Sequence, residues 1–431
     1  HPAHHKQQTE NLPIQRVPFG KDYVMPLAQH IGVPARAIVS AGERVKRGQL
    51  IAEPGGFVST GLHSPVTGTI REIGDFRGVD GRFAPAIAIE ADAFATQQVD
   101  AGAGIDWQSL SLEEFIKAVQ MAGIVGMGGA AFPAHVKLSV PDGVTIRHLL
   151  INGAECEPYL TTDHRLMLER PEALLEGAEI MRQKLGAEEV TIGIEANKPD
   201  AIETVRNLIQ PGDPVRVMPL KVKYPQGAEK MMIKSVFDVE VPAGQLPRDV
   251  GVNVNNVGTI IAVADYFLRG IPLIERVVTV AGPGVTYPAN LIVPLGTPVR
   301  DVVKFCGGLK SGTREIIMGG PMMGRPIASL DVPILKGCSG VLVFTEEQTA
   351  RRKEYPCISC GRCLEACPYF LNPSRLARLS KARMFDEMKA FNVFDCVECG
   401  CCTFACPSNI PIVQLIRTAK DDLSHRKEPD E

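Results

Sequence analysis

The sequence predicts an α/β protein built from several domains, and three observations support this prediction. Its 431 residues suggest about three domains of roughly 150 residues each. Strand and helix patterns alternate between residues 146 and 220, which is typical of a parallel sheet with crossover helices. Eight of the 12 cysteines are confined to residues 357–406, which indicates a separate C-terminal domain.

The composition argues against two classes of function. Hydrophobic residues make up 45% and charged residues 22% of the chain, which fits a globular protein with ample core. The formal net charge is −3, so there is no broad basic field and we expect no nucleic-acid partner. The most apolar stretch, Val254 to Ile271, contains Asp265 and Arg269, so we expect no transmembrane helix. The first residue is His1 rather than Met, and we expect further residues upstream.

The clustered cysteines form two runs with the same spacing, C-x2-C-x2-C-x3-C-P. The first run contains Cys357, Cys360, Cys363 and Cys367, and the second contains Cys396, Cys399, Cys402 and Cys406. In ferredoxins with this spacing, three cysteines bind one 4Fe-4S cluster and the fourth, before proline, binds the other. We therefore expect one cluster on Cys357, Cys360, Cys363 and Cys406, and a second cluster on Cys367, Cys396, Cys399 and Cys402.

Disulfides and structural zinc are the alternatives for these cysteines. Disulfides are rare in the cytosol, and a zinc site needs four ligands without this doubled register. Cys401 is out of phase with its run and is interpreted as a spectator, and the scattered Cys156, Cys306 and Cys338 as buried, inert thiols. Between the runs, residues 372–391 have helical spacing and predict an inserted helix or two. Its basic residues either meet an acidic partner or form a solvated helix face.

Residues 37–90 contain short β-rich stretches separated by glycines, which predicts a small β-domain. The phrases Val45-x2-Gly48 and Pro65-x2-Gly68 resemble the two halves of the lipoyl/biotinyl barrel-sandwich fold. That family carries a lysine in the turn between its halves, but the turn from Glu53 to Thr60 has none. We therefore expect a structural or docking role for this domain.

A glycine-dense loop from Gly123 to Pro133 follows a predicted helix that begins near Leu112. Gly126-x-Gly128-x-x-Ala131 formally fits the dinucleotide fingerprint, but that motif normally follows a strand, so an ordinary Rossmann site is disfavoured. The exposed backbone N–H groups of such a loop, which leads towards Lys137, are suited to binding phosphate. A simple tight turn is the alternative.

The following segment alternates between strands and helices. We predict strands at 146–152, 189–194 and 215–220 and helices at 171–185 and 199–209. Glu155 and Glu157 follow the first strand, where ligands bind in open α/β sheets, although a solvated turn is the alternative. Strand patterns at 277–282, 291–296 and 315–319 with a helix at 299–305 resemble the soluble-ligand-binding β-grasp (SLBB) family.

Several motifs, taken in order, resemble the NADH-oxidising subunit of respiratory complex I. They are the glycine loop, Asn152 to Pro158, Tyr224 to Glu229 and Asn255 to Thr259. The resemblance implies that FMN is bound by Gly126, Gly128, Gly129, Lys137, Asn152, Glu155, Gly227, Asn255, Asn256 and Thr259. It implies that NADH faces Phe132, Glu157 and Glu229. Ala154, Met127 and Ala228 depart from the complex I pattern, so flavin and nucleotide affinities are expected to differ.

The domain order, with the phrases Gly319 to Gly324, Ala154 to Tyr159 and Cys406 to Pro411, resembles the C subunit of the Rnf (Rsx) electron-transport complex. The predicted domains are a barrel-sandwich domain (1–100), a Rossmann-like FMN/NADH domain (105–272), an SLBB-like β-grasp domain (273–345), a double-cubane ferredoxin-like domain with a helical insertion (350–415) and a charged tail (416–431).

This resemblance implies that the chain oxidises NADH through non-covalently bound FMN and passes single electrons to two 4Fe-4S clusters. It implies a peripheral subunit on the cytoplasmic side of a membrane, with other Rnf subunits as partners and ferredoxin or flavodoxin as indirect partners. Coupled movement of Na⁺ or H⁺ would occur elsewhere in the complex. No side-chain acid or base is required, because hydride chemistry resides in the cofactors. The alternatives are a soluble flavin reductase of the cobalamin-reductase type and a relay that uses only the clusters.

Overall fold

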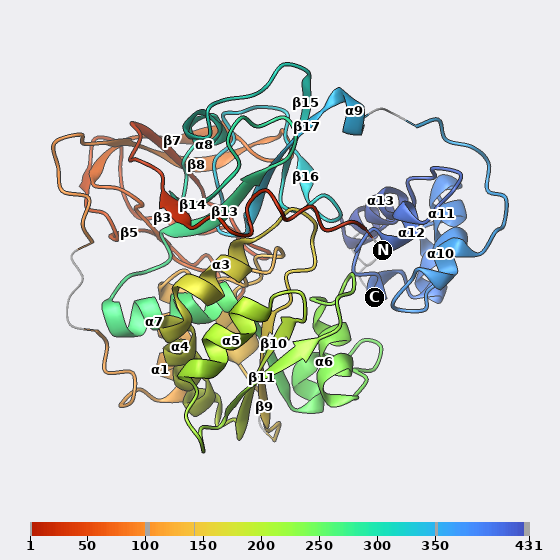
Figure 1. Ribbon diagram of the computed structural model, residues 1–431. Coiled ribbons are helices and arrows are strands. Elements are labelled where there is room, and N and C mark those ends of the chain that lie inside the picture. Colours follow the sequence, from red (N-terminus) through yellow and green to blue (C-terminus); the bar gives the residue numbers. More distant parts are fainter. Residues whose placement is uncertain (1, 100–103, 142, 350–351, 426–431) are drawn as a thin grey trace, which may run out of the picture. The chain divides into compact units, whose positions relative to one another are not determined.

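The structure is a computed structural model that describes residues 2–99, 104–141, 143–349 and 352–425. The chain divides into two compact units. The first unit takes in the chain up to Val241 together with Leu246–Gln348, and the second takes in Pro242–Gln245 and the chain from Thr349 onward. The ribbon diagram in Figure 1 gives the elements of each unit.

The N-terminal β-domain consists of two small antiparallel sheets, with strand orders β2-β8-β7-β4 and β3-β5-β6. Its strands are β2 (Asp22–Pro26), β3 (Arg36–Ala37), β4 (Arg44–Val45), β5 (Leu50–Glu53), β6 (Leu62–His63), β7 (Gly68–Arg77) and β8 (Phe83–Ala91). Side chains alternate along β2, so Tyr23 and Met25 are buried opposite Ile89 and Ile87. The expected barrel-sandwich architecture is confirmed.

A four-stranded parallel sheet, ordered β11-β10-β9-β12, forms the centre of the next domain. Its strands are β9 (His148–Gly153), β10 (Glu189–Glu195), β11 (Val215–Leu220) and β12 (Val252–Asn256). Its helices are α1 (Leu112–Met121), α2 (Ala134–Leu138), α3 (Thr162–Glu169), α4 (Pro171–Leu185), α5 (Pro199–Leu208), α6 (Glu229–Phe237), the 3-10 helix η1 (Pro247–Val250) and α7 (Val257–Arg269). The strands and helices predicted between residues 146 and 220 are confirmed, whereas α3, α6 and α7 are additions.

Helix α4 has clear start and stop signals and packs tightly on α7. Pro171 occupies its first turn, and Gly186 ends it in the left-handed conformation with φ 66°. A methyl group on Gly177 would lie 2.1 Å from the Ile260 carbonyl oxygen, so glycine is needed for this close helix contact. Figure 1 shows α4 and α5 running along the parallel strands.

The β-grasp domain is a six-stranded mixed sheet, ordered β1-β14-β13-β17-β15-β16. Its elements are β1 (Ile14–Arg16), β13 (Glu275–Ala281), β14 (Ala289–Pro294), α8 (Val299–Phe305), β15 (Thr313–Met318), β16 (Arg325–Pro326) and β17 (Gly340–Thr345), followed by α9 (Glu346–Thr349). Strand β1 falls in the segment predicted to belong to the barrel-sandwich domain, yet it pairs with β14. This pairing could not be predicted, because pairing between such distant segments leaves no local signal in the sequence.

Lys336 connects the three domains of the first unit. Its fully buried ammonium group donates to Thr60 Oγ1 at 3.2 Å, to the Gly61 carbonyl at 2.8 Å and to the Gly123 carbonyl at 2.7 Å. Burial lowers the pKa of Lys336 to about 7. Two of the acceptors belong to the barrel-sandwich domain, and the third is the first residue of the glycine loop.

The second unit is helical. Its elements are α10 (Arg362–Glu365), α11 (Pro373–Lys381), η2 (Asp386–Phe391), η3 (Val393–Asp395), α12 (Cys401–Phe404) and α13 (Ile412–His425). The predicted charged tail is wrong as far as His425, because α13 buries Ile416, Ala419 and Leu423. The rest of that segment lies outside the described residues. Among the described residues, no helix is both long enough and apolar enough to cross a membrane.

Candidate functional site

The carboxyl ends of β9 and β12 form the centre of the first candidate site. Chain order along the sheet reverses between these strands, and ligands in open α/β sheets bind at such a reversal. Asn152 at the end of β9 pairs in register with Asn256 at the end of β12. Three of the predicted flavin-binding residues therefore lie together at the carboxyl ends of the strands, which we call the sheet edge. They are Asn152, Asn255 and Asn256.

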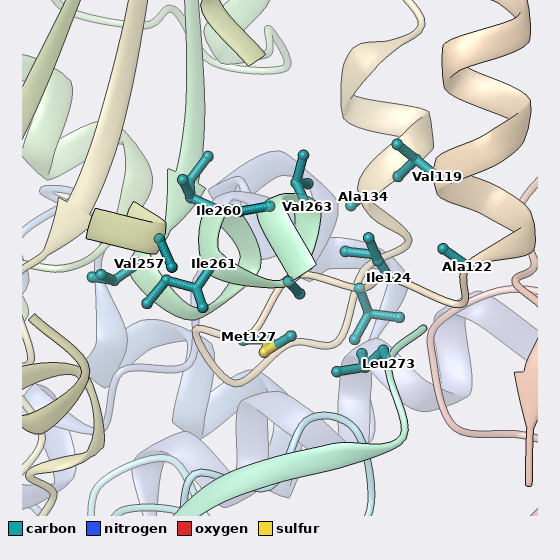
Figure 2. Packing of buried hydrophobic residues seen from close by; sticks show 14 of the residues in the cluster. Val119, Ala122, Ile124, Met127, Ala134, Val257, Ile260, Ile261, Val263 and Leu273 are labelled. Atoms are coloured by element: carbon teal, nitrogen blue, oxygen red, sulfur yellow. The ribbon is translucent and has the colours of Figure 1, made fainter. Parts of the chain in front are cut away.

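The glycine loop is closed at its base and fixed to α7. The Gly126 N–H donates to the Phe132 carbonyl at 2.7 Å, and Val125 bridges to Pro133. Thr259 on α7 accepts from the Met127 N–H at 3.0 Å and donates to the Val125 carbonyl at 3.2 Å. Figure 2 shows Met127 on the side of α7 that faces away from Ile260 and Val263. The loop is thus placed at the amino end of α7.

The tip of this loop presents free backbone donors. Gly128, Gly129 and Ala130 are exposed, and within the described part of the chain their N–H groups have no acceptor. Gly129 has φ 112°, which favours glycine, and a methyl group there would meet no atom within 4 Å. Exposed amides in open space next to a helix amino terminus are suited to a phosphate group.

A second segment, residues 224–229, packs against the same edge. The Asn152 side-chain amide donates to the Gly227 carbonyl at 2.8 Å. A methyl group on Gly227 would lie 2.6 Å from the Ala154 carbonyl oxygen, so only glycine permits this contact. Asn255 Oδ1 and Gln226 Nε2 are buried, and neither has a partner among the described residues. An unpaired acceptor and an unpaired donor at this edge fit a bound cofactor with polar ring atoms.

The two glutamates after β9 are engaged by the chain itself. Glu155 Oε1 accepts from Thr162 Oγ1 and from the Asp163 N–H, both at 2.9 Å, at the amino end of α3. Glu157 accepts from the backbone N–H groups of Met322 at 3.0 Å and Met323 at 2.9 Å. These contacts hold the segment after β9 against α3 and against the β-grasp domain.

Lys137 and Glu229 form an ion pair at the same side of the sheet. Lys137 also donates to the Val254 carbonyl at 3.2 Å. Phe132 is partly buried at the base of the glycine loop. The resemblance implies that Lys137 contacts FMN and Glu229 contacts NADH, and the fold brings the two side chains together.

Three residues of this region had no predicted role. Gln226 lies inside the motif from Tyr224 to Glu229, but the resemblance assigned no role to it. Arg276 on β13 donates to the Met127 carbonyl at 2.7 Å. Asp163 Oδ2 accepts from the Asn256 side-chain amide at 2.6 Å, and burial raises the pKa of Asp163. Arg276 and Asp163 both lie outside the motifs that carry the family resemblance, so the sequence did not single them out.

The eight predicted cluster ligands surround two cavities of the second unit, and each cavity takes cysteines from both runs. One cavity is lined by Cys357, Cys360, Cys363 and Cys406. The other is lined by Cys367, Cys396, Cys399 and Cys402, and also by Cys401. Each cavity thus contains one predicted set of four, and Cys401, which was interpreted as a spectator, lines the second cavity as well. Within the described ranges, no three His, Cys, Asp or Glu side chains are arranged for a single metal ion. A four-iron cubane holds its thiolates farther apart than one ion does, and each cavity contains the four cysteines that such a cluster needs.

The two runs have matching backbones. Ser359 and Glu398 occupy equivalent positions and have φ 55° and 58°. Gly361 and Gly400, which precede α10 and α12, have φ 79° and 80°. This repeated geometry curls each run around its cavity. The runs differ in exposure, because Cys357 and Cys360 are exposed whereas Cys399 and Cys402 are buried.

Four known domain families match the chain in order. They are the RnfC barrel sandwich hybrid domain at residues 1–94, the Nuo51 FMN-binding domain at 119–265, the SLBB domain at 277–326 and the 4Fe-4S dicluster domain at 355–410. The match at 119–265 covers the glycine loop and the edge of the parallel sheet. The match at 355–410 covers both cysteine runs.

Curated relatives match nearly the whole chain. The C subunit of the proton-translocating ferredoxin:NAD(+) oxidoreductase complex of Clostridium ljungdahlii is 46% identical, over 97% of this chain and 92% of the relative. The C subunit of the Na(+)-translocating ferredoxin:NAD(+) oxidoreductase complex of Acetobacterium woodii is 39% identical, over 97% of this chain and 95% of the relative. The C subunit of the ion-translocating oxidoreductase complex of Rhodobacter capsulatus is 41% identical, over 99% and 83%.

Among solved structures, a chain of an NAD+-reducing [NiFe]-hydrogenase in the H2-reduced state is similar in fold, with a TM-score of 0.51 and 18% identity. The similarity covers 78% of this chain and 75% of that one. The high identity and coverage of the curated relatives establish that this chain belongs to the RnfC family, the C subunits of ion-translocating oxidoreductase complexes.

Proposed function

We propose that this chain is the NADH-oxidising subunit of a membrane-bound, ion-translocating ferredoxin:NAD(+) oxidoreductase. In this role it passes electrons between NADH, FMN and two 4Fe-4S clusters. One observation carries the proposal: the chain combines a sheet edge with free loop amides and two separate sets of four cysteines. Its relatives of similar length are named as subunits of such a complex.

The proposed FMN site comprises Gly126, Gly128, Gly129, Lys137, Asn152, Glu155, Gly227, Asn255, Asn256 and Thr259. The free N–H groups at the loop tip support phosphate binding there. The unpaired Asn255 Oδ1 and Gln226 Nε2 support a polar ring system at the sheet edge. The proposed NADH contacts are Phe132, Glu157 and Glu229.

FMN, when bound, supplies the exchange between two-electron nicotinamide chemistry and one-electron cluster chemistry. The chain's own residues bind and orient. The loop amides bind the phosphate, Asn152 fixes Gly227 so that residues 224–229 close one side of the site, and Thr259 holds the loop on α7. No proton transfer by a side chain is required, so no catalytic acid or base is assigned.

The proposed cluster ligands are the two crossed sets of cysteines. Crossed ligation would join the runs, because each cluster draws one cysteine from the other run. The cavity linings support this division. The exposed set, which includes Cys357 and Cys360, is the one open to an external electron partner.

The proposed partners are the other subunits of the complex, with ferredoxin or flavodoxin as an indirect partner through those subunits. We propose a peripheral position on the cytoplasmic side of the membrane. The finding that no described helix could cross a bilayer is compatible with that position.

Anaerobic purification followed by iron and flavin analysis tests the proposal. About eight irons and one FMN per chain are expected, because each cluster contains four irons. NADH should bleach the flavin absorbance and produce the EPR signals of reduced cubanes. Eight irons without flavin, and no reduction by NADH after FMN is supplied, would leave a cluster relay and refute NADH oxidation.

A further inference from the structure

Arg276 places a buried positive charge directly behind the glycine loop. The residue lies on β13 of the β-grasp domain and is 2% exposed. Its guanidinium donates to the Met127 carbonyl at 2.7 Å and to the Lys336 carbonyl at 2.9 Å. Because Met127 immediately precedes the loop tip, Arg276 fixes the backbone from which the free amides of Gly128 and Gly129 project.

This charge lacks a direct counter-ion. In the part of the chain that the structure describes, no carboxylate lies within 4.0 Å of the Arg276 guanidinium, and its hydrogen bonds to Met127 and Lys336 both go to neutral carbonyls. The buried carboxylates of Asp163 and Glu155 act on it at longer range, and burial lowers the pKa of Arg276. A buried cation without a paired anion is costly, so the surroundings favour an anion at this place.

The amino end of α7 adds a second positive influence at the same point. Asn256 caps α7 by accepting from the Gly258 N–H at 2.9 Å, and the amino end of this 13-residue helix carries partial positive charge. A methyl group on Gly258 would lie 3.3 Å from both Arg276 Nη1 and the Met127 sulfur. The guanidinium, the start of α7 and the loop are therefore immediate neighbours.

We infer that Arg276 is a positioning residue for the phosphate group of FMN. It acts through the Met127 carbonyl, which sets the loop amides, and through its buried positive charge behind them. This inference rests on the proposed FMN site and adds to it a residue from the β-grasp domain. That domain thereby contributes to flavin binding.

The test compares FMN with riboflavin, which has the same ring system but no phosphate. Both affinities are measured by flavin fluorescence on the flavin-free full chain with its clusters intact, for Arg276→Met and Arg276→Lys. Arg276→Met should weaken FMN binding about tenfold to hundredfold, the range for hydrogen bonds that involve a charged group. Riboflavin binding should change less than about threefold, because it lacks the anion. Arg276→Lys keeps the charge and should lie between the unaltered chain and Arg276→Met.

Arg170→Met is the matched control. Arg170 pairs with Asp265 at the opposite end of α7, at 2.6 and 2.8 Å, so this substitution also removes an arginine that supports α7. It should leave the ratio of FMN to riboflavin affinity unchanged. Inorganic phosphate should compete with FMN and not with riboflavin, and this competition should weaken in Arg276→Met.

A second variant keeps the test decisive if Arg276→Met does not fold. Asp163→Asn retains an oxygen that can accept from Asn256 but removes a negative charge near Arg276. At pH 8 it should strengthen FMN binding about threefold to tenfold and leave riboflavin binding unchanged.

Two results would overturn the inference. The first is an equal loss of FMN and riboflavin affinity in Arg276→Met together with no gain of FMN affinity in Asp163→Asn. Arg276 would then have only a structural role, and the proposed FMN site would be unaffected. Failure of the unaltered chain to bind either flavin would refute the proposed FMN site, and the role of Arg276 with it.

Discussion

Replacing Cys406 with serine should damage the cluster of the first cysteine run and spare the cluster of its own run. Cys406 lines the cavity with Cys357, Cys360 and Cys363, whereas the rest of its run lines the other cavity together with Cys367. Serine retains the size of the side chain but replaces the thiolate by a poor ligand for iron. The local backbone should therefore persist while one cluster loses one of its four ligands.

The expected magnitude follows from this count and from exposure. Loss of the whole cluster would lower the iron content from about eight to about four per chain, and loss of one iron would lower it to about seven. Cys357 and Cys360 are exposed, so the weakened cluster would be open to solvent, and we expect the larger loss. The second cluster, with Cys399 and Cys402 only 9% and 8% exposed, should keep its EPR signal.

The assay is iron analysis and EPR of dithionite-reduced protein, made with two matched variants. Cys360 and Cys406 lie in different runs but are predicted to bind the same cluster, so the spectra of Cys360→Ser and Cys406→Ser should agree. Cys402→Ser shares a run with Cys406→Ser and should affect the other signal. If Cys406→Ser instead reproduces Cys402→Ser, each run holds its own cluster and the crossed assignment is wrong.

Two further predictions concern the first unit. In Gly320→Ala, the new methyl group would lie 2.3 Å from the Glu157 carboxyl group, so the hydrogen bond from the Met322 N–H should break. That amide should exchange about tenfold or more faster by hydrogen-exchange mass spectrometry, and unchanged exchange would contradict the contact. Burial lowers the pKa of Lys336 to about 7 from 10.5. Below pH 7 the folded chain must keep a buried ammonium group, which lowers the free energy of unfolding. Between pH 7 and 10.5 the folded chain holds the neutral amine while the unfolded chain still binds the proton, so the free energy of unfolding rises with pH. The free energy of unfolding, followed by the fluorescence of Trp107, the single tryptophan, should therefore increase from pH 7 to 9 in the unaltered chain more than in Lys336→Met, and equal slopes would refute this reasoning.

Elements with complete local signals could be predicted from the sequence. Helix α4 begins at Pro171 and ends before Gly186, as predicted, because a proline start and a glycine stop bound an apolar pattern. Helix α7 was missed for a physical reason. Its residues from Val257 to Ala264 are all buried, so this part of the helix has no polar face. The spacing of its apolar residues therefore does not predict a helix. The pairing of β1 with β14 joins Ile14 to Asn290 and could not be predicted from either segment alone.

The two candidate sites differ in how far sequence could predict them. The proposed cluster ligation depends on spacing within two short runs, and the matching backbone conformations at Gly361 and Gly400 support it. The sheet-edge site depends on segments that are far apart in the chain, so resemblance supplied residues such as Asn152. It could not supply Arg276, because that contact depends on how β13 packs against the glycine loop.

The two glutamates after β9 show why residue identity alone does not define a nucleotide site. Glu157 has its two carboxylate oxygens on the Met322 and Met323 amides, so a contact with NADH would compete with those amides for the same oxygens. Hydrogen bonds to a charged acceptor contribute about 1.5–3 kcal/mol each. Any binding free energy that NADH gains from Glu157 is therefore reduced by the free energy of the Met322 and Met323 hydrogen bonds that are weakened. Gly320→Ala weakens the competing contact without removing the carboxylate. If Glu157 binds NADH, this variant should bind it more tightly than the unaltered chain, because less of the binding energy is used to release the loop.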